Sequence, residues 1–389
     1  MDSSLEVNGS ILCSKWDLST QTPHGGQEWR GMKNFIEDFS VTTNPLGTPE
    51  IALKAALDVA STIHHYPAAD FEPAWSSMAE YISKDRSFAV ATVTNGTHKK
   101  SLLDDLKSRL LLGNGASELI DLCIRCCPGS TWRPGPFRTQ YKEYERAAES
   151  NGKKALEWDD SAADILCMVN PCNPTGDFWT AEEVKRYIEQ TCKDNSTVLL
   201  DESMIPFLGP NWRSESIVSQ EAWMEDMHQR RGIHIFVVHS WTKIWSCPGL
   251  RIGTLVTPNA DYAKQIRRRQ VPWSLNSFAI AFLASVTQDE EYMRQTWEFI
   301  PAWRKAMHTA ISACHPHWKI HGVEWMSFLW IETPSKEEAE YYVTLCKERG
   351  VPIRWGSNGY NLPSFIRLGV RNPESVDVLM NALQQPFLI

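Results

Sequence analysis

The sequence predicts an α/β fold with a mostly parallel, doubly wound sheet. Three short apolar runs, at 165–169, 197–200 and 235–238, have the length and composition of buried strands. Helical patterning separates them, and alternating strands and helices are typical of a parallel sheet. Polar residues follow each run, so we expect the chemistry at the carboxyl ends of the strands.

A fourth apolar run, at 110–112, leads into a glycine turn and the start of a helix at 113–120. Free backbone N–H groups and the positive end of the helix dipole face such a turn, which makes it a site for an anion. We therefore expect Gly115, Ala116 and Ser117 to contact a phosphate.

The run at 165–169 continues into Asn-Pro-Cys-Asn-Pro-Thr-Gly at 170–176. Because a residue that precedes proline avoids the helical region, this turn is extended and holds Asn173 at the strand end. Thr180 and Glu183 have the spacing of a capping box for the next helix. The run at 197–200 then ends at Asp201.

The run at 235–238 leads to Ser240, Thr242 and Lys243, and Arg251 lies eight residues after the lysine. A buried lysine readily loses its proton, and the neutral amine can form a Schiff base with an aldehyde. The two hydroxyl groups and the guanidinium have the donors to hold a phosphate. Pyridoxal 5′-phosphate carries both an aldehyde and a phosphate, and it is the expected cofactor.

The pattern changes after about residue 272. A strand at 328–331, a helix capped by Ser335 that stops at Gly350, and a strand at 365–370 predict a smaller α+β domain. We predict three parts: an N-terminal arm with part of the small domain (1–45), a large cofactor-binding domain (46–275) and a C-terminal small domain (276–389).

Composition and charge exclude several classes of protein. The net charge of −8 gives no electrostatic reason to expect nucleic acid. No apolar stretch is long enough to span a membrane, and the first residues lack the basic and apolar regions of a secretory signal, so we expect a cytoplasmic protein. Ten cysteines in 389 residues do not suggest a disulfide framework. The pair His64 and His65 has no third ligand at useful spacing, so we expect no metal site.

From residue 44 to 371 the chain resembles the fold-type I, pyridoxal-phosphate-dependent aminotransferase class I/II superfamily. The resemblance rests on the motifs at 170–176, 201–202, 240–243 and 249–253, in this order. Within the superfamily the chain is similar to the branch that holds histidinol-phosphate aminotransferase and threonine-phosphate decarboxylase. Shorter strings at 23–26, 44–47, 272–276 and 366–371 look more like the decarboxylase.

The resemblance implies a role for each polar residue at the strand ends. Lys243 would hold the cofactor and act as general acid and base, Asp201 would keep the pyridine nitrogen protonated, and Asn173 would hydrogen-bond the phenolic oxygen. Tyr141 would stack on the ring. The implied phosphate ligands are Ala116, Ser117, Ser240, Thr242 and Arg251.

Two further implications concern the oligomer and the substrate. Tyr66 would reach the phosphate bound by a neighbouring subunit, which implies a homodimer with shared active sites. Arg367 would clamp the α-carboxylate of an amino acid through its planar guanidinium. Other candidates for substrate contacts are Arg354, Arg371, His24 and Asn44.

One position departs from the family pattern. Met204 stands where aminotransferases of this branch usually have a tyrosine that donates to the phenolic oxygen, and methionine cannot donate. Our first hypothesis is an aminotransferase that acts on an amino acid through a quinonoid or carbanion intermediate. The alternatives are an α-decarboxylase of an amino acid or phospho-amino acid, which Met204 favours, a β-lyase, and a non-catalytic protein that has kept the fold.

Overall fold

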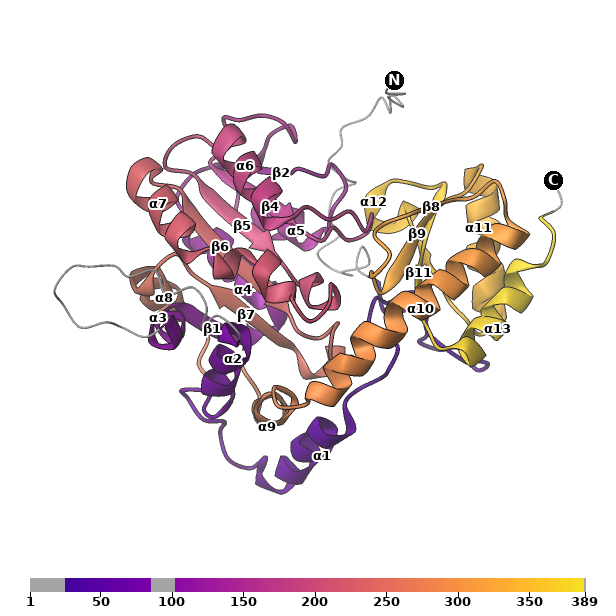
Figure 1. Ribbon diagram of the computed structural model, residues 1–389, viewed down its shortest axis with the longest axis horizontal. Coiled ribbons are helices and arrows are strands. Elements are labelled where there is room, and N and C mark those ends of the chain that lie inside the picture. The colour runs from indigo at the N-terminus through magenta and orange to yellow at the C-terminus, as the bar shows by residue number, and fades with distance from the viewer. Residues whose placement is uncertain (1–24, 85–101, 388–389) are drawn as a thin grey trace.

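The computed structural model describes residues 25–84 and 102–387, and these form an α/β fold with two sheets (Figure 1). Within these residues the larger sheet has seven strands in the order β1-β7-β6-β5-β4-β2-β3. From one edge to the other, its strands are β1 (Leu110–Asn114), β7 (Ile252–Val256), β6 (His234–Ser240), β5 (Thr197–Asp201), β4 (Ile165–Val169), β2 (Thr131–Pro134) and β3 (Lys154–Ala155).

The larger sheet is mostly parallel, as predicted. Strands β3, β2, β4, β5 and β6 pair in parallel, whereas β7 runs antiparallel to both of its neighbours, β6 and β1. In the register, Val169 of β4 is level with Asp201 of β5, and Asp201 is level with Val238 of β6. The turns that follow β4, β5 and β6 therefore meet at one edge of the sheet.

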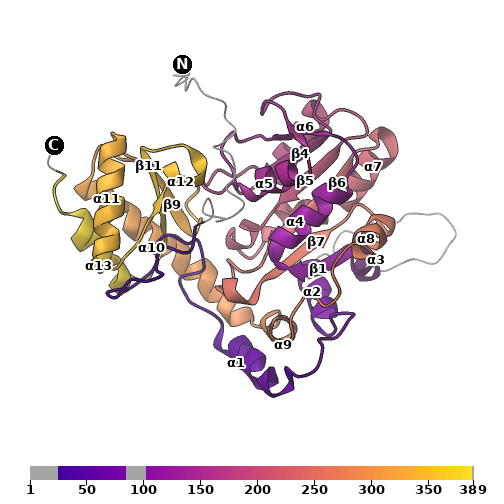
Figure 2. The ribbon, with the colours of Figure 1, turned by 180° about the vertical axis from the view of Figure 1, so that it is seen from behind.

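Helices cover both faces of this sheet. Along β4 and β5, Leu166, Met168, Val198 and Leu200 belong to one core cluster, and the alternate residues belong to the other, as the two-residue period of a strand requires. One face packs against α2 (Ala74–Ser83), α6 (Ala181–Thr191), α7 (Glu221–Arg231) and α9 (Ser277–Val286). The other face packs against α4 (Gly115–Cys126), α5 (Glu143–Ser150) and α8 (Ala260–Arg267). Figures 1 and 2 show the two layers from opposite sides.

The smaller sheet has four antiparallel strands in the order β10-β11-β9-β8 within the described residues. Its strands are β10 (Arg354–Trp355), β11 (Phe365–Gly369), β9 (Phe328–Glu332) and β8 (Lys319–His321). It packs against α11 (Lys336–Glu348) and α13 (Pro373–Leu383), and α12 (Ser357–Tyr360) connects β10 to β11. Phe39 also lies in this core, so a residue of the N-terminal arm packs with the smaller sheet.

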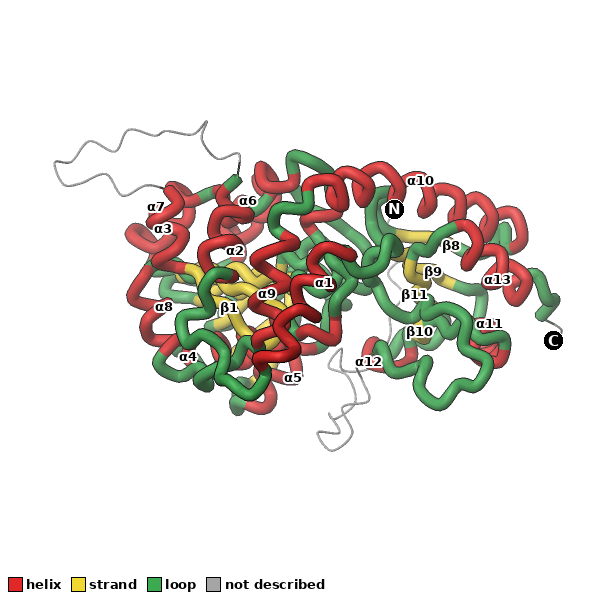
Figure 3. Tube along the Cα trace, turned by 90° about the horizontal axis from the view of Figure 1, so that it is seen from below, coloured by secondary structure: helices red, strands yellow, loops and turns green. Residues whose placement is uncertain are grey.

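One long helix joins the two parts. Helix α10 (Glu290–Cys314) packs its first half, through Tyr292 and Ile300, into the core of the larger sheet. Its second half, through Met307 and Ile311, packs into the core of the smaller sheet. The remaining α-helices of the described residues are α3 (Leu102–Arg109), which precedes β1, and α1 (Glu50–Asp58), which lies beside α9 (Figure 3).

The predicted boundary after residue 275 stays a prediction, and the packing of α9 favours a later one. Helix α9 buries Ala279, Phe282 and Leu283 in the core of the larger sheet. Local start signals behave as predicted: Thr180 and Glu183 form the capping box of α6, and the Ser335 side chain caps α11.

Candidate active site

Lys243 lies in the loop that follows β6, beside two hydroxyl groups. Its Nζ donates to Oγ of Ser240 at 3.1 Å and to Oγ1 of Thr242 at 3.2 Å. Burial and the nearby Arg251 lower the pKa of Lys243 to about 8, although Asp201 opposes the shift. At neutral pH roughly one amine in ten is therefore uncharged, whereas at the ordinary pKa the fraction would be about one in several thousand.

A glycine turn lies at the start of α4 beside the guanidinium of Arg251, and we call this arrangement the cradle. Gly115 has a φ of +79°, and a Cβ atom there would lie 2.3 Å from Nη2 of Arg251. A Cβ atom on Gly253 would lie 2.4 Å from the backbone nitrogen of Ala116. Gly115 thus lets the guanidinium of Arg251 lie against the first turn of the helix, and Gly253 lets strand β7 approach the backbone of that turn. Backbone N–H groups and a cation at the same place are what a phosphate binds.

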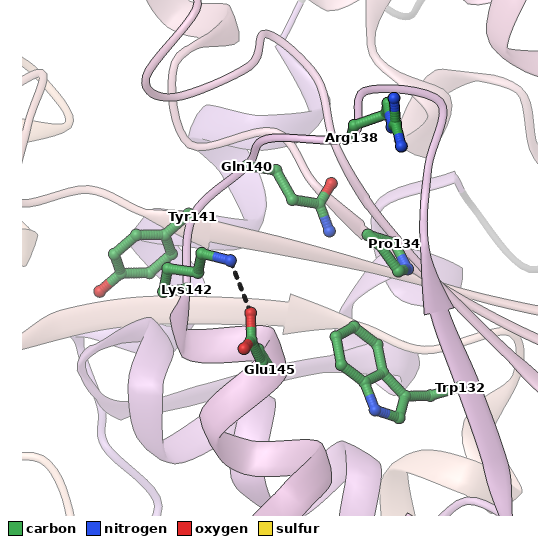
Figure 4. A pocket seen from close by; sticks show the side chains of 7 residues that line it. All are labelled: Trp132, Pro134, Arg138, Gln140, Tyr141, Lys142 and Glu145. Carbon is green, nitrogen blue, oxygen red and sulfur yellow. Dashed lines mark hydrogen bonds and ion pairs between the residues drawn. The ribbon is translucent and has the colours of Figure 1, made fainter. Parts of the chain in front are cut away.

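Tyr141 lies between this cradle and the end of β2. Its hydroxyl group forms a hydrogen bond with Ser117 of α4, and burial raises the pKa of Tyr141, so the phenol stays neutral. A small pocket beside its ring (Figure 4) is lined by Trp132, Pro134, Arg138, Gln140, Tyr141, Lys142 and Glu145. Lys142 and Glu145 form an ion pair of 2.7 Å in it. Tyr141 is the lining residue that this pocket shares with the predicted site.

Asp201 is the last residue of β5, and its buried carboxylate accepts two hydrogen bonds. The hydroxyl of Tyr144 donates to Oδ2 at 2.7 Å, and the backbone N–H of Ser203 donates to Oδ1 at 2.8 Å. The hydroxyl of Ser203 also accepts a 2.7 Å hydrogen bond from the backbone N–H of Ser240. These contacts fix the carboxylate relative to the loop that carries Lys243.

Tyr144 belongs to the core and also contacts Asp201. Its ring is fully buried in the core against α4, and its hydroxyl group reaches Asp201. Burial and the adjacent Asp201 raise the pKa of Tyr144, so it remains a hydrogen-bond donor.

Arg367 and Asn173 meet across the two parts of the chain. Nη1 of Arg367 donates to Oδ1 of Asn173, and Nη2 donates to the carbonyl of Ser40 at 2.8 Å. Its Nε is buried and has no hydrogen-bond partner among the described residues. Burial lowers the pKa of Arg367, yet a guanidinium remains charged. A buried guanidinium with an unused donor is suited to bind a carboxylate.

Asn44, a predicted substrate contact, holds the lysine loop instead. Its backbone N–H donates to the carbonyl of Lys243 at 2.8 Å. Its side-chain amide donates to the carbonyl of Ile244 at 2.9 Å and to Oγ1 of Thr296 at 2.7 Å. Asn44 thereby ties the loop of the larger sheet to helix α10.

Arg371, another predicted substrate contact, holds the N-terminal arm. Its guanidinium pairs with Glu37 at 3.2 Å and donates to the carbonyls of Asp38 and Thr43. Arg354 is buried and pairs with Glu28 at 3.0 Å. The fifth substrate candidate, His24, lies outside the described residues.

Tyr66 lies on the surface of this chain, with 78% of its area exposed. Its ring stacks on that of Trp273, with 4.4 Å between the centroids. Met204 is buried in the core beside Ile205 and Phe207, where its thioether offers no hydrogen-bond donor.

Sequence reasoning missed four contributors: Glu28, Ser40, Thr296 and Ser203. Glu28, Ser40 and Thr296 lie in segments without a catalytic motif, and Ser203 lies between the motif at 201–202 and Met204 at a position to which we assigned no role. In the part of the chain that the structure describes, no helix is long and apolar enough to cross a membrane. No group of three or more His, Cys, Asp or Glu side chains in those residues could hold a metal ion.

The chain is similar to known proteins over nearly its whole length. The family model for aminotransferase class I and II matches residues 36–383. A putative threonine-phosphate decarboxylase of Caldanaerobacter subterraneus is 27% identical, with 88% of each chain covered. Histidinol-phosphate aminotransferase of Hyphomonas neptunium is 23% identical, with 92% of each chain covered.

Solved structures share the fold. Histidinol-phosphate aminotransferase of Sinorhizobium meliloti, in complex with pyridoxal-5′-phosphate, has a TM-score of 0.72 at 16% identity and covers 96% of this chain and 97% of its own. L-threonine-O-3-phosphate decarboxylase of Porphyromonas gingivalis has a TM-score of 0.68 at 21% identity and covers 90% of this chain and 98% of its own. The match to the family model shows that this chain belongs to the aminotransferase class I and II family, whose cofactor is pyridoxal 5′-phosphate.

Proposed function

We propose that the protein transfers the amino group of an amino acid to pyridoxal 5′-phosphate, with Lys243 as the group that moves the proton. The observation that supports this most directly is the position of Lys243, whose lowered pKa makes it a general base near neutral pH. It lies in one loop with Ser240 and Thr242, and the cradle of Gly115 and Arg251 is adjacent.

The residues at the strand ends fit this cofactor by their chemistry. When bound, pyridoxal 5′-phosphate withdraws electrons from the α-carbon of the substrate. The α4 N-terminus with Ser117, Ser240, Thr242 and Arg251 would hold its phosphate, and the close approach of Arg251 to Gly115, which an added Cβ would obstruct, supports this assignment. Asp201 would face the pyridine nitrogen, and its two donors would keep the carboxylate in place.

Three other residues would orient the ring and the substrate. Tyr141 would lie against the ring face, where its neutral phenol also binds Ser117. Asn173 would hydrogen-bond the phenolic oxygen of the cofactor. Arg367, with its unpartnered Nε, would hold the α-carboxylate of the substrate and so orient the bond that breaks at the α-carbon.

Product analysis tests this function. The purified, cofactor-loaded protein is incubated with a panel of amino acids and no keto-acid acceptor. Transamination yields one keto acid per active site and leaves pyridoxamine phosphate. The Lys243→Ala variant should lose about 10³-fold or more of this activity. Keto-acid formation at the wild-type rate by that variant would contradict the proposal.

Decarboxylation is the second candidate, and Met204 is the observation that favours it. The side chain at this position cannot donate a hydrogen bond to the phenolic oxygen, which removes one means of tuning the ring. In the same experiment, a decarboxylase would release amine and carbon dioxide over many turnovers. Release of ammonia with a thiol would identify a β-lyase, and a colourless protein that takes up no cofactor would identify a non-catalytic one.

We also propose a cytoplasmic homodimer that shares its active sites through Tyr66. The exposed ring of Tyr66, its stack on Trp273 and the exposed Ile63 and Val271 support an apolar surface that a second copy would cover. Light scattering would give the mass in solution. Mixing a Tyr66→Ala variant with a Lys243→Ala variant should restore part of the activity in mixed dimers, and no recovery would argue against shared sites.

A further inference from the structure

Arg354 places a second guanidinium beside Arg367. The two residues are direct partners in the antiparallel β10–β11 ladder, so their side chains leave the same face of the smaller sheet. Arg354 is 3% exposed. Two neighbouring guanidiniums could bind a substrate with two anionic groups, an α-carboxylate and a side-chain phosphate, if both were available.

Glu28 forms an ion pair with Arg354. Its Oε1 accepts from Nη1 of Arg354 at 3.0 Å, and its Oε2 accepts from the backbone N–H groups of Gly26 and Gln27 at 2.7 and 2.8 Å. The hydroxyl of Ser40 also donates to Oε2 at 3.1 Å. Burial acts to raise the pKa of Glu28, but Arg354 and the hydrogen bonds outweigh it and lower the pKa below the ordinary value. Glu28 is therefore a charged carboxylate at neutral pH.

This ion pair lies next to the proposed carboxylate clamp. Ser40 connects them, because its hydroxyl donates to Glu28 while its carbonyl accepts from Nη2 of Arg367. Arg367 in turn donates to Asn173 at the edge of the larger sheet. In the proposed binding mode, the side chain of a substrate whose α-carboxylate binds Arg367 would meet this neighbouring pair of a cation and an anion.

A count of charges shows what remains for the substrate. Arg251 and Lys243 face the cofactor, and Arg367 faces the α-carboxylate. Arg354 and Glu28 cancel each other, so no uncompensated positive charge is left among these residues for a second anion. A phosphate dianion near Arg354 would also lie close to the Glu28 carboxylate. Two negative charges that are close together repel strongly where water is excluded.

We propose that the site selects an amino acid whose side chain carries no phosphate or other anionic group, because Glu28 neutralises Arg354 and repels a second anion. This inference rests on the proposed function, since it needs the cofactor at Lys243 and the substrate carboxylate at Arg367. It separates this chain from relatives whose names contain a phosphorylated substrate.

Paired ligands that differ by one phosphate test the proposal. The cofactor-loaded protein is titrated with L-threonine and O-phospho-L-threonine, and with L-tyrosine and O-phospho-L-tyrosine, while the absorption of the cofactor reports binding. We expect each phosphorylated ligand to bind the wild type at least ~10-fold more weakly than its partner, about 1.4 kcal/mol. Equal or tighter binding of the phosphorylated ligands would overturn the proposal.

Two variants assign the effect to Glu28. Glu28→Gln keeps the shape and removes the charge, and it should improve the affinity for phosphorylated ligands relative to their partners by roughly 10-fold or more. Glu37→Gln is the matched control. Glu37 also pairs with a buried arginine, but that arginine, Arg371, holds the N-terminal arm. It should leave the ratio unchanged, and an equal effect of both variants would overturn the role of Glu28.

The outcomes separate this inference from the proposed function. If no chromophore that depends on Lys243 forms, the proposed function fails and this inference fails with it. If the chromophore forms and amino acids bind, but the phosphate makes no difference, only the inference fails. The wild-type ratio decides this even if Glu28→Gln does not fold.

Discussion

Replacing Tyr144 with phenylalanine removes the hydroxyl that donates to Asp201 at 2.7 Å and leaves the ring in place. Hydrogen bonds to charged groups contribute roughly 1.5–3 kcal/mol, and the buried carboxylate would keep only the donor from Ser203. We therefore expect the free energy of unfolding to fall by about 1.5–3 kcal/mol. At about 2.1 cal/mol/K per residue, unfolding of the whole chain has an entropy of roughly 0.8 kcal/mol/K, so Tm should fall by about 2–4 °C.

Tyr81 provides the matched control. Its ring is also buried, but its hydroxyl has no hydrogen-bond partner among the described residues. Tyr81→Phe removes an unsatisfied polar group, so it should be neutral or stabilising. Scanning calorimetry of the cofactor-free proteins compares the two variants. The reasoning would be refuted if Tyr144→Phe kept the wild-type Tm, or if both variants lost the same amount.

Four further outcomes follow from the site and the fold. Gly115→Ala should weaken cofactor binding by roughly 10-fold or more, because its Cβ would lie 2.3 Å from Arg251; Gly152→Ala, which also has a positive φ but no atom within 4 Å, should leave binding unchanged. The rate of cofactor uptake should rise with pH and level off above about 8, because the pKa of Lys243 in the folded chain is about 8; a rise that continues towards 10.5 would contradict this. Between pH 8 and 10.5 the Lys243 amine binds a proton in the unfolded chain more often than in the folded chain. The contribution of Lys243 to the free energy of unfolding of the cofactor-free protein should therefore increase from pH 8 to 10.5. Thr180→Ala should cost about 1 kcal/mol by loss of the α6 cap, measured by denaturant unfolding, with cofactor affinity unchanged.

Local sequence patterns were sufficient for the parts of the site that lie at strand ends. Lys243, Asp201 and Asn173 each follow a short apolar run, and the parallel pairing of β4, β5 and β6 brings those ends to one edge. The glycine turn before α4 could also be predicted from the sequence, because a left-handed Gly115 and a helix start are local features. The roles proposed for these residues still await the experiments above.

Contacts between segments that are distant in the chain could not be predicted from local sequence patterns. Arg354, Arg371 and Asn44 were all polar residues in suitable segments, and the sequence suggested the same role for each. In the folded chain Arg371 binds the carbonyls of the arm and Asn44 binds the lysine loop, whereas Arg354 faces Arg367 across a strand ladder.

The amino-acid pattern alone identified the α/β class, the helix caps and the family, and it predicted Lys243 as the cofactor lysine, because strand length, capping and turn chemistry act over a few residues. It did not show that Glu28 pairs with Arg354, 326 positions away, or that Tyr144 supports Asp201 across 57 positions. Such pairs form only when the arm, the two sheets and helix α10 pack together. The charge left for a substrate is therefore a property of the folded chain.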